Sequence, residues 1–154
     1  NLEFSSICNL RCKWCSLDHD KPKQFMSREL LAKVLDDVIA DPGIRLDRIE
    51  LHNAGETLLH PDLPGMFAEI ARRKASLPRI NLLTNAGPLN QARTAAILDS
   101  GAIDDIRFSV DGGTRELFED LRKPAKWASI RANIHAFLDA NARQERRLRT
   151  GIIC

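Results

Sequence analysis

Three cysteines lie close together near the start of the chain. Cys8, Cys12 and Cys15 have the spacing C-x3-C-x2-C, directly after a short strand-like run. Three thiolates on one short loop can hold three irons of a [4Fe–4S] cube and leave the fourth iron without a protein ligand. Because an iron with an open position can bind another molecule, this arrangement indicates catalysis more than simple electron transfer.

Other uses of these cysteines are possible. A structural zinc site usually has four ligands in paired spacings, so His19 would have to supply the fourth, and this alternative stays open. A disulfide framework is not expected, because three close cysteines and the distant Cys154 make poor pairs. A two-cluster ferredoxin would carry two C-x2-C-x2-C-x3-C-P runs, and the chain has one run of a different order.

The composition favours one domain, which we assign to residues 1–154. A chain of 154 residues that is 44% hydrophobic can bury one core. Its net charge of +2 is too small to indicate nucleic acid or an acidic membrane surface as a partner. No apolar run approaches the ~20 residues of a membrane span, and no signal-like segment is visible. The chain begins at Asn1, so we expect that an upstream segment has been lost, and reduced thiols indicate the cytoplasm.

Strand-like runs alternate with helical patterns along the whole chain. The strands are expected at 2–5, 48–52, 79–84, 105–110 and 149–154, and the helices at about 27–40, 61–71, 90–100, 114–121 and from 127 onward. This alternation predicts βαβ units and a parallel sheet. Because a complete (β/α)8 barrel needs roughly 200–250 residues, we expect an α/β fold that is the N-terminal part of a TIM-like barrel, with outer helices, truncated after about five strands.

Residues that could do chemistry recur where the expected strands end, which is where parallel α/β folds place their active sites. The run Asn-Ala-Gly-Glu-Thr at 53–57 has small residues that let the backbone approach a ligand, and Glu56 can accept hydrogen bonds from an ammonium group. The run Thr-Asn-Ala-Gly at 84–87 contains Asn85, which offers a donor and an acceptor. Taken alone, the run at 53–57 is better explained as an ordinary loop, and the run at 84–87 could equally be a simple turn.

The fourth expected strand ends in the run Phe-Ser-Val-Asp-Gly-Gly at 108–113. Strand alternation places Ser109 and Asp111 on the same face. Asp111 could instead cap the turn into the helix that starts near Thr114. His52, at the end of the second strand, is interpreted as a packed polar residue rather than an acid or base, despite its suitable pKa range.

Together, these motifs resemble the radical S-adenosylmethionine (radical SAM) superfamily. The cysteine spacing is similar, with the aromatic Trp14 just before the last cysteine. The run at 53–57 resembles the Gly-Gly-Glu motif of that superfamily, with Ala54 in place of the first glycine. The runs at 84–87 and 108–113 are similar to its Thr-Asn-Gly and to the Ser-x-Asp-Gly of its peptide-modifying branch. The resemblance covers essentially the whole chain but not the whole of a partial barrel with about six βα units.

The resemblance implies two cofactors, a [4Fe–4S] cluster and S-adenosylmethionine (SAM). The implied ligands of the cluster are Cys8, Cys12 and Cys15, and the implied SAM-binding residues are Trp14, Gly55, Glu56, Asn85, Ser109 and Asp111. Glu56 would lie near the methionyl amino group and Ser109 near the carboxylate or ribose. No catalytic residue is assigned. Asp111 and Cys154 are candidates, although a free cysteine is commonly a small buried hydrophobe.

The implied activity is reductive cleavage of SAM to a 5′-deoxyadenosyl radical, which abstracts hydrogen from a peptide or small metabolite. The helices after residue 113 resemble the branch with an extra cysteine-rich C-terminal domain (SPASM/twitch type). An electron donor such as flavodoxin or ferredoxin is implied as a partner. An RNA-modifying radical SAM enzyme is the alternative enzyme, and a structural zinc or iron–sulfur module is the alternative without catalysis.

Overall fold

Four parallel strands form the central sheet of the computed structural model, which describes residues 1–154. They are β2 (Arg48–Glu50), β3 (Arg79–Thr84), β4 (Asp105–Ser109) and β6 (Arg149–Ile153), in the spatial order β2-β3-β4-β6. Each strand pairs in parallel with the next one along this sheet. The predicted βαβ architecture is therefore confirmed, and the neighbouring carboxyl ends of the strands form one edge of the sheet.

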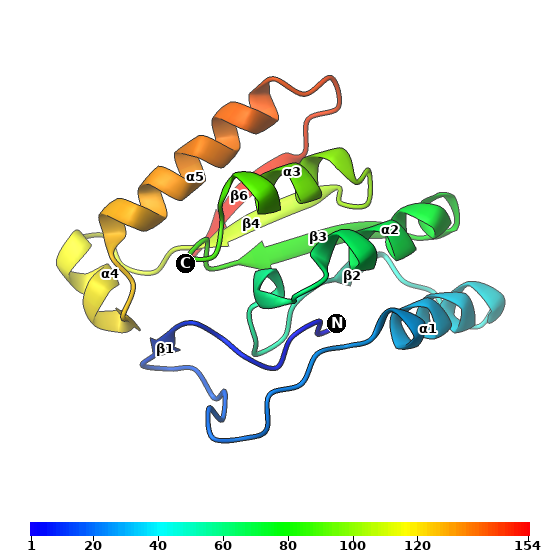
Figure 1. The fold of residues 1–154 in the computed structure, drawn as a ribbon, viewed down its shortest axis with the longest axis horizontal. Coiled ribbons are helices and arrows are strands. Elements are labelled where there is room, and N and C mark those ends of the chain that lie inside the picture. The colour runs from blue at the N-terminus through cyan, green and yellow to red at the C-terminus, as the bar shows by residue number, and fades with distance from the viewer.

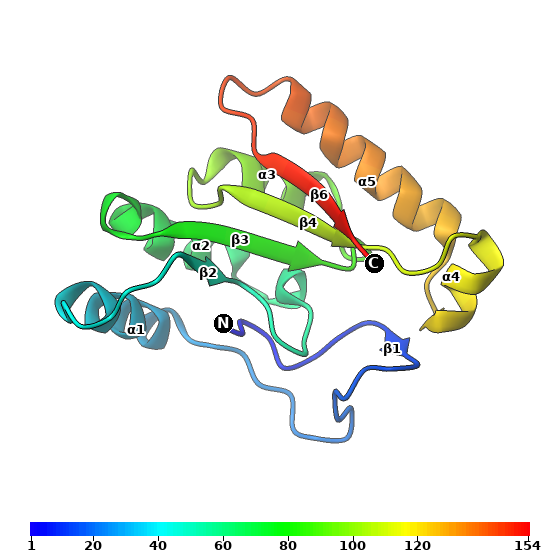
Figure 2. The same cartoon turned by 180° about the vertical axis from the view of Figure 1, so that it is seen from behind.

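Helices follow the strands in the predicted order. They are α1 (Arg28–Ala40), α2 (Leu63–Arg73), α3 (Gln91–Asp99), α4 (Arg115–Leu121) and α5 (Trp127–Ala142), with short 3-10 helices η1 (Thr57–Leu59) and η2 (Lys74–Ser76). Helices α2, α3 and α5 lie on one face of the sheet (Figure 1). Figure 2 shows the opposite face, where no helix covers β3, β4 or β6. None of the helices has the length and apolar character needed to cross a bilayer.

Side-chain caps fix where the helices begin. The side chains of Ser27, Asp62, Asn90 and Thr114 accept hydrogen bonds from backbone N–H groups in the first turns of α1, α2, α3 and α4, respectively. Each cap satisfies a donor that has no partner within the helix, which typically stabilises the helix by about 1 kcal/mol. The predicted helix starts are therefore correct to within two residues.

Strand alternation divides the sheet into an apolar and a polar face. In β3, Ile80 and Leu82 are fully buried in the core. In β4, Phe108 packs edge-to-face on Phe137 of α5, with ring centroids 5.6 Å apart. The intervening residues, including Ser109, face the bare side of the sheet. The helix-covered face is therefore the core, and the bare face is available to position polar groups.

The expected first strand at 2–5 is wrong. Its backbone hydrogen bonds are divided between two partners: Leu2 N–H donates to Glu50 O at 2.8 Å, whereas Ser5 forms an isolated antiparallel bridge with Phe25. Because neither partner continues alongside, no ladder forms. The segment is extended but irregular, and the sheet has four strands rather than about five.

A two-stranded antiparallel ribbon joins the cysteine loop to the end of α4. Its strands are β1 (Arg11–Cys12) and β5 (Arg122–Lys123), with Cys12 opposite Arg122. Lys13 N–H extends the contact by donating to Leu121 O at 3.0 Å. This pairing was not predicted. It places residues more than a hundred positions apart at the same edge of the sheet.

Candidate functional site

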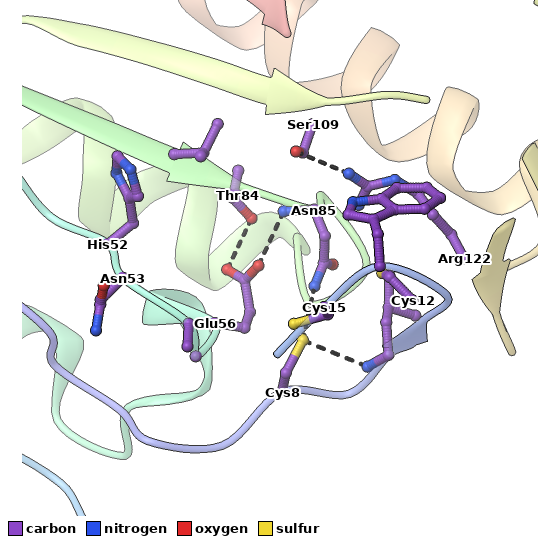
Figure 3. Close-up of a pocket in the computed structure, with 15 residues that line it drawn as sticks. Cys8, Cys12, Cys15, His52, Asn53, Glu56, Thr84, Asn85, Ser109 and Arg122 are labelled. Atoms are coloured by element: carbon purple, nitrogen blue, oxygen red, sulfur yellow. Dashed lines mark hydrogen bonds between the residues drawn. The ribbon is translucent and has the colours of Figure 1, made fainter. Parts of the chain in front are cut away.

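A pocket opens at the carboxyl edge of the sheet, where the cysteine loop meets three strand ends (Figure 3). Four segments line it: the loop around Cys8, Cys12 and Cys15, the loop 52–56 after β2, the end of β3 at 83–85, and Ser109 together with Arg122. The motifs singled out in the sequence, dispersed over more than a hundred positions, therefore meet in one place.

All three thiols of the cysteine loop line this pocket. Cys8 and Cys12 are partly buried, and burial is the main reason that the pKa of each thiol is raised. The nearby Arg122 acts in the opposite direction on the pKa of Cys12. Backbone N–H groups point at two of the sulfurs, from Leu10 to Cys8 Sγ at 3.4 Å and from Leu17 to Cys15 Sγ at 3.5 Å. Such donors stabilise sulfur that carries negative charge.

The side chains do not form a ready site for a single metal ion. No three His, Cys, Asp or Glu groups converge closely enough to hold one, and this includes the cysteines with His19. A [4Fe–4S] cube makes a different demand, because each thiolate binds a different iron. Three thiols around a common pocket, two of them receiving N–H donors, fit the cube.

Glu56 is buried at the base of the pocket and is held by several donors. Thr84 donates its hydroxyl to Oε1 at 2.8 Å, and Asn85 N–H donates to Oε2 at 2.8 Å. Leu58 N–H donates to Oε1 at 3.1 Å, so Glu56 also caps η1. Burial raises the pKa of the Glu56 carboxyl, and these hydrogen bonds act against that rise. Since a carboxylate has about four acceptor positions, the three donors leave about one free.

The backbone before Glu56 is packed against the start of the chain. A side chain at Gly55 would place its Cβ 1.8 Å from Ser5 O, so only glycine fits. The carboxylate of Glu3 accepts from two successive amides, Ala54 N–H at 2.9 Å and Gly55 N–H at 2.8 Å. Glu3 was missed in the sequence because nothing in its own segment shows that its partners lie about fifty positions away.

Asn85 links the end of β3 to the cysteine loop. Its side-chain Nδ2 lies 3.6 Å from Cys8 Sγ and donates to Asn9 Oδ1 at 3.0 Å. The next residue, Ala86, has a positive φ of 61°, which is rare for a residue with a side chain. Ala86 N–H donates to Thr84 Oγ1 at 3.0 Å, which holds the strained turn in place. The prediction that Asn85 binds SAM stays a prediction.

Arg122 is a pocket residue that the sequence analysis did not identify. It is buried, and its guanidinium donates to Ser109 Oγ at 2.8 Å and to Asp111 Oδ2 at 2.6 Å. The same group lies 5.9 Å from the centre of the Trp14 ring, within range of a cation–π contact. The cap of α4 is Thr114, so the alternative that Asp111 caps that helix is wrong. Asp111 pairs with Arg122 instead.

His52 and Cys154, two further candidates from the sequence, differ in their relation to the pocket. His52 lines the pocket, with Nδ1 3.6 Å from Glu50 Oε2, and its pKa is lowered, mainly by burial. The ring is therefore neutral near pH 7. Cys154 is exposed after the end of β6 and does not line the pocket, so it does not join the other three cysteines.

Comparison with known proteins agrees with this geometry. The family described as "Radical SAM superfamily" matches residues 2–152. The chain is 29% identical over 130 residues to a GTP 3′,8-cyclase of Chlorobaculum tepidum, a match that covers 84% of this chain and 37% of the cyclase. It is 31% identical over 111 residues to a tungsten-containing aldehyde ferredoxin oxidoreductase cofactor-modifying protein of Pyrococcus furiosus, covering 71% of this chain and 30% of that protein.

A solved structure shows the same fold. Native anSMEcpe with bound AdoMet and a peptide superposes with a TM-score of 0.73 at 18% sequence identity, over 99% of this chain and 42% of that one. The α/β fold with a parallel sheet is thus that of part of a radical SAM barrel. The chain spans about two fifths or less of the length of these proteins.

Proposed function

The chain belongs to the radical SAM superfamily, and from that premise we propose that residues 1–154 form the cofactor-binding part of an enzyme that abstracts hydrogen from a peptide or small metabolite. Enzymes of this superfamily use a [4Fe–4S] cluster and SAM. When bound, these cofactors supply one electron and the 5′-deoxyadenosyl radical that performs the abstraction. The observation that carries the proposal is the meeting of three thiols, a buried carboxyl and a buried guanidinium around one pocket.

The thiolates of Cys8, Cys12 and Cys15 are the proposed ligands of the cluster. Their loop is held in shape by the β1–β5 ribbon and by N–H groups directed at the sulfurs. Three protein ligands leave one iron available to SAM. Because thiolates rather than thiols bind iron, the raised pKa of Cys8 and Cys12 means that binding of iron must displace their protons.

Arg122 and Ser109 are the proposed partners of the methionyl carboxylate of SAM. A guanidinium has five N–H donors in a rigid plane and pairs well with a carboxylate. Ser109 Oγ and Asp111 engage part of this group and hold it at the pocket wall. Asp111 is thereby proposed to act through Arg122. Trp14, exposed at the rim and close to Arg122, is the proposed cover of the adenine.

The loop at 54–56 is the proposed site for the methionyl ammonium group. Gly55 lets the backbone approach closely, and the acceptor position that remains on Glu56 is suited to a cation. The burial that raises the pKa of Glu56 favours pairing with a positive charge, since an ammonium would compensate for the lost hydration of the carboxylate. SAM would then lie across the strand ends from β2 to β4.

The bare face of the sheet is the proposed side for the substrate. Below the pocket, Glu50 lies beside His52, and Asn81 Oδ1 is buried without a partner. A polar substrate could satisfy such groups. The similarity to cyclases named for GTP, at higher identity than to the peptide-bound anSMEcpe, favours a small polar metabolite. An electron donor such as flavodoxin or ferredoxin and a reducing compartment such as the cytoplasm complete the proposal.

Anaerobic reconstitution tests this function directly. We expect at least four irons per chain in the reconstituted full-length protein, and an EPR signal of the reduced cluster that changes when SAM is added. Cys12→Ala should lose the cube, whereas Cys154→Ala, in the exposed thiol outside the pocket, should retain it. Zinc in place of iron, or a cube that is indifferent to SAM, would contradict the proposal and indicate a structural or electron-transfer module.

A further inference from the structure

Asn85 contacts both halves of the proposed cofactor site. Its backbone N–H donates to Glu56 Oε2 at 2.8 Å, and its side-chain Nδ2 lies 3.6 Å from Cys8 Sγ. For a sulfur acceptor, which is larger than oxygen, this separation is a hydrogen-bond distance. The Asn85 side chain is buried, and Cys8 is partly buried at the pocket wall. Figure 3 shows Asn85 between Glu56 and the cysteines.

The orientation of the Asn85 amide is fixed by its neighbours. Gly87 N–H donates to Asn85 Oδ1 at 2.8 Å, and Asn9 Oδ1 accepts from Nδ2 at 3.0 Å. With the amide turned the other way, its NH2 group would face the Gly87 N–H donor, and its oxygen would face two acceptors, Asn9 Oδ1 and Cys8 Sγ. The group that faces Cys8 is therefore the N–H donor and not the carbonyl.

The turn after β3 holds this amide in place. A Cβ at Gly87 would lie 2.8 Å from Asn85 Oδ1, so glycine is needed for the close approach. From α5, Asn133 Nδ2 donates to Ala86 O at 3.0 Å. The strained φ of Ala86 is thus supported from both sides, and Asn85 is presented to Cys8 by a rigid turn rather than by a mobile loop.

Cys8 receives two donors, since Leu10 N–H also points at its sulfur, at 3.4 Å. Hydrogen bonds to a ligating sulfur withdraw electron density from it and stabilise the cluster when it gains an electron. We propose that Asn85 is a positioning residue that raises the reduction potential of the cluster through its hydrogen bond to Cys8. This inference rests on the proposed function, because Cys8 must be a cluster ligand.

The test compares reduction potentials at equal iron content. Asn85→Leu preserves the approximate size of the side chain and removes the donor, and Asn85→Asp replaces the donor with an acceptor. In the reconstituted full-length protein, both variants should shift the midpoint potential, measured by EPR-monitored titration, to more negative values. Asn133→Ala is the comparison variant, because it removes a hydrogen bond to the same turn but keeps the Asn85 donor. Its potential should shift less than that of Asn85→Leu.

An unchanged potential in a fully loaded Asn85→Leu variant overturns the inference, and so does an equal shift in Asn133→Ala. Failure of the wild type to assemble a cube would instead reject the proposed function. If neither Asn85 variant loads four irons, the wild type is labelled with 15N only at asparagine side-chain amides. A 15N hyperfine coupling to the reduced cluster that persists in Asn9→Asp, which keeps an acceptor for Asn85, supports the inference. Its absence overturns it.

Discussion

Thr84 donates its hydroxyl to Oε1 of Glu56 at 2.8 Å, which ties the end of β3 to the loop after β2. Both residues are buried, so the bond is shielded from water. A buried carboxyl without partners would cost several kcal/mol. The hydrogen bonds to Glu56 therefore fix the position of a carboxyl that burial alone would disfavour, and this position forms one wall of the pocket.

Replacing Gly55 should destabilise the protein. In Gly55→Ala the new Cβ would lie 1.8 Å from Ser5 O, so the first segment of the chain must move. We expect a loss of about 2–3 kcal/mol in the free energy of unfolding, typical of overpacking. Gly113→Ala, where no atom lies within 4 Å of the new Cβ, is the matched control. Urea denaturation of the two variants measures the difference, and equal stability would show that the loop at 54–56 is not packed as described.

Removing the carboxylate of Glu3 should weaken SAM binding without removing the cluster. In Glu3→Ala the amides of Ala54 and Gly55 lose their acceptor, which costs about 1–2 kcal/mol. If the loop binds SAM, this cost corresponds to a roughly tenfold fall in the affinity for SAM. Glu3→Gln keeps an acceptor oxygen and should restore most of the affinity. Calorimetric titration of SAM into reconstituted protein measures both. Unchanged affinity in Glu3→Ala would separate this loop from SAM binding.

Substitution of Arg122 tests the proposed carboxylate site. Arg122→Lys keeps the charge but cannot reproduce the planar contacts to Ser109 and Asp111. We expect the affinity for SAM to fall by about 10–100-fold, the range for loss of a hydrogen bond to a charged group. Iron content provides the control, since no thiol is changed. If the affinity for methionine falls in parallel and that for 5′-deoxyadenosine does not, the carboxylate assignment is supported; the reverse pattern would reject it.

Glu56 should make stability depend on pH in a particular direction. Because burial raises its pKa in the folded protein, its contribution to stability is complete below the pKa of the unfolded chain, about 4.3, and is lost as the pH rises through the folded pKa. The free energy of unfolding of the wild type relative to Glu56→Gln should therefore decrease from pH 4 upward, as measured by urea denaturation without cofactors.

Glu119 provides the control of opposite sign. The N–H of Trp127 is the main reason that its pKa is lowered, so its contribution is present above the unfolded pKa and is lost as the pH falls. The free energy of unfolding of the wild type relative to Glu119→Gln should therefore increase from acid toward neutral pH. If both differences vary in the same direction with pH, the assigned environment of Glu56 is wrong.

Local sequence was sufficient to place most elements. Local patterns predicted the helices close to their observed starts, because the apolar positions of one helix and its capping residue, such as Ser27 or Asn90, lie within a few residues of each other. The strand at 79–84 was predicted with its observed bounds, and those at 105–110 and 149–154 to within one residue. The run at 2–5 had the same apolar character, but no other segment pairs with it along its whole length, so it does not form a strand.

The cysteine spacing and the motifs at the strand ends were also visible in the sequence. They predicted the superfamily and the meeting of four loops at one edge, because all strands of a parallel sheet end on the same side. What the spacing could not provide was the hydrogen-bond partners of each motif. Glu56, for example, is engaged by Thr84 and Asn85, which belong to another motif.

The motifs in the sequence were sufficient by themselves to indicate the superfamily and the cofactors that it implies, because each motif lies within one short run of residues. Only the tertiary structure decided how those motifs are supported. Arg122 reaches the pocket because β5 pairs with β1. Glu3, at the start of the chain, accepts hydrogen bonds from the loop at 54–56. Asn85 meets Cys8 from the end of another strand. These contacts join distant positions, and their existence depends on how the whole sheet folds rather than on any local pattern.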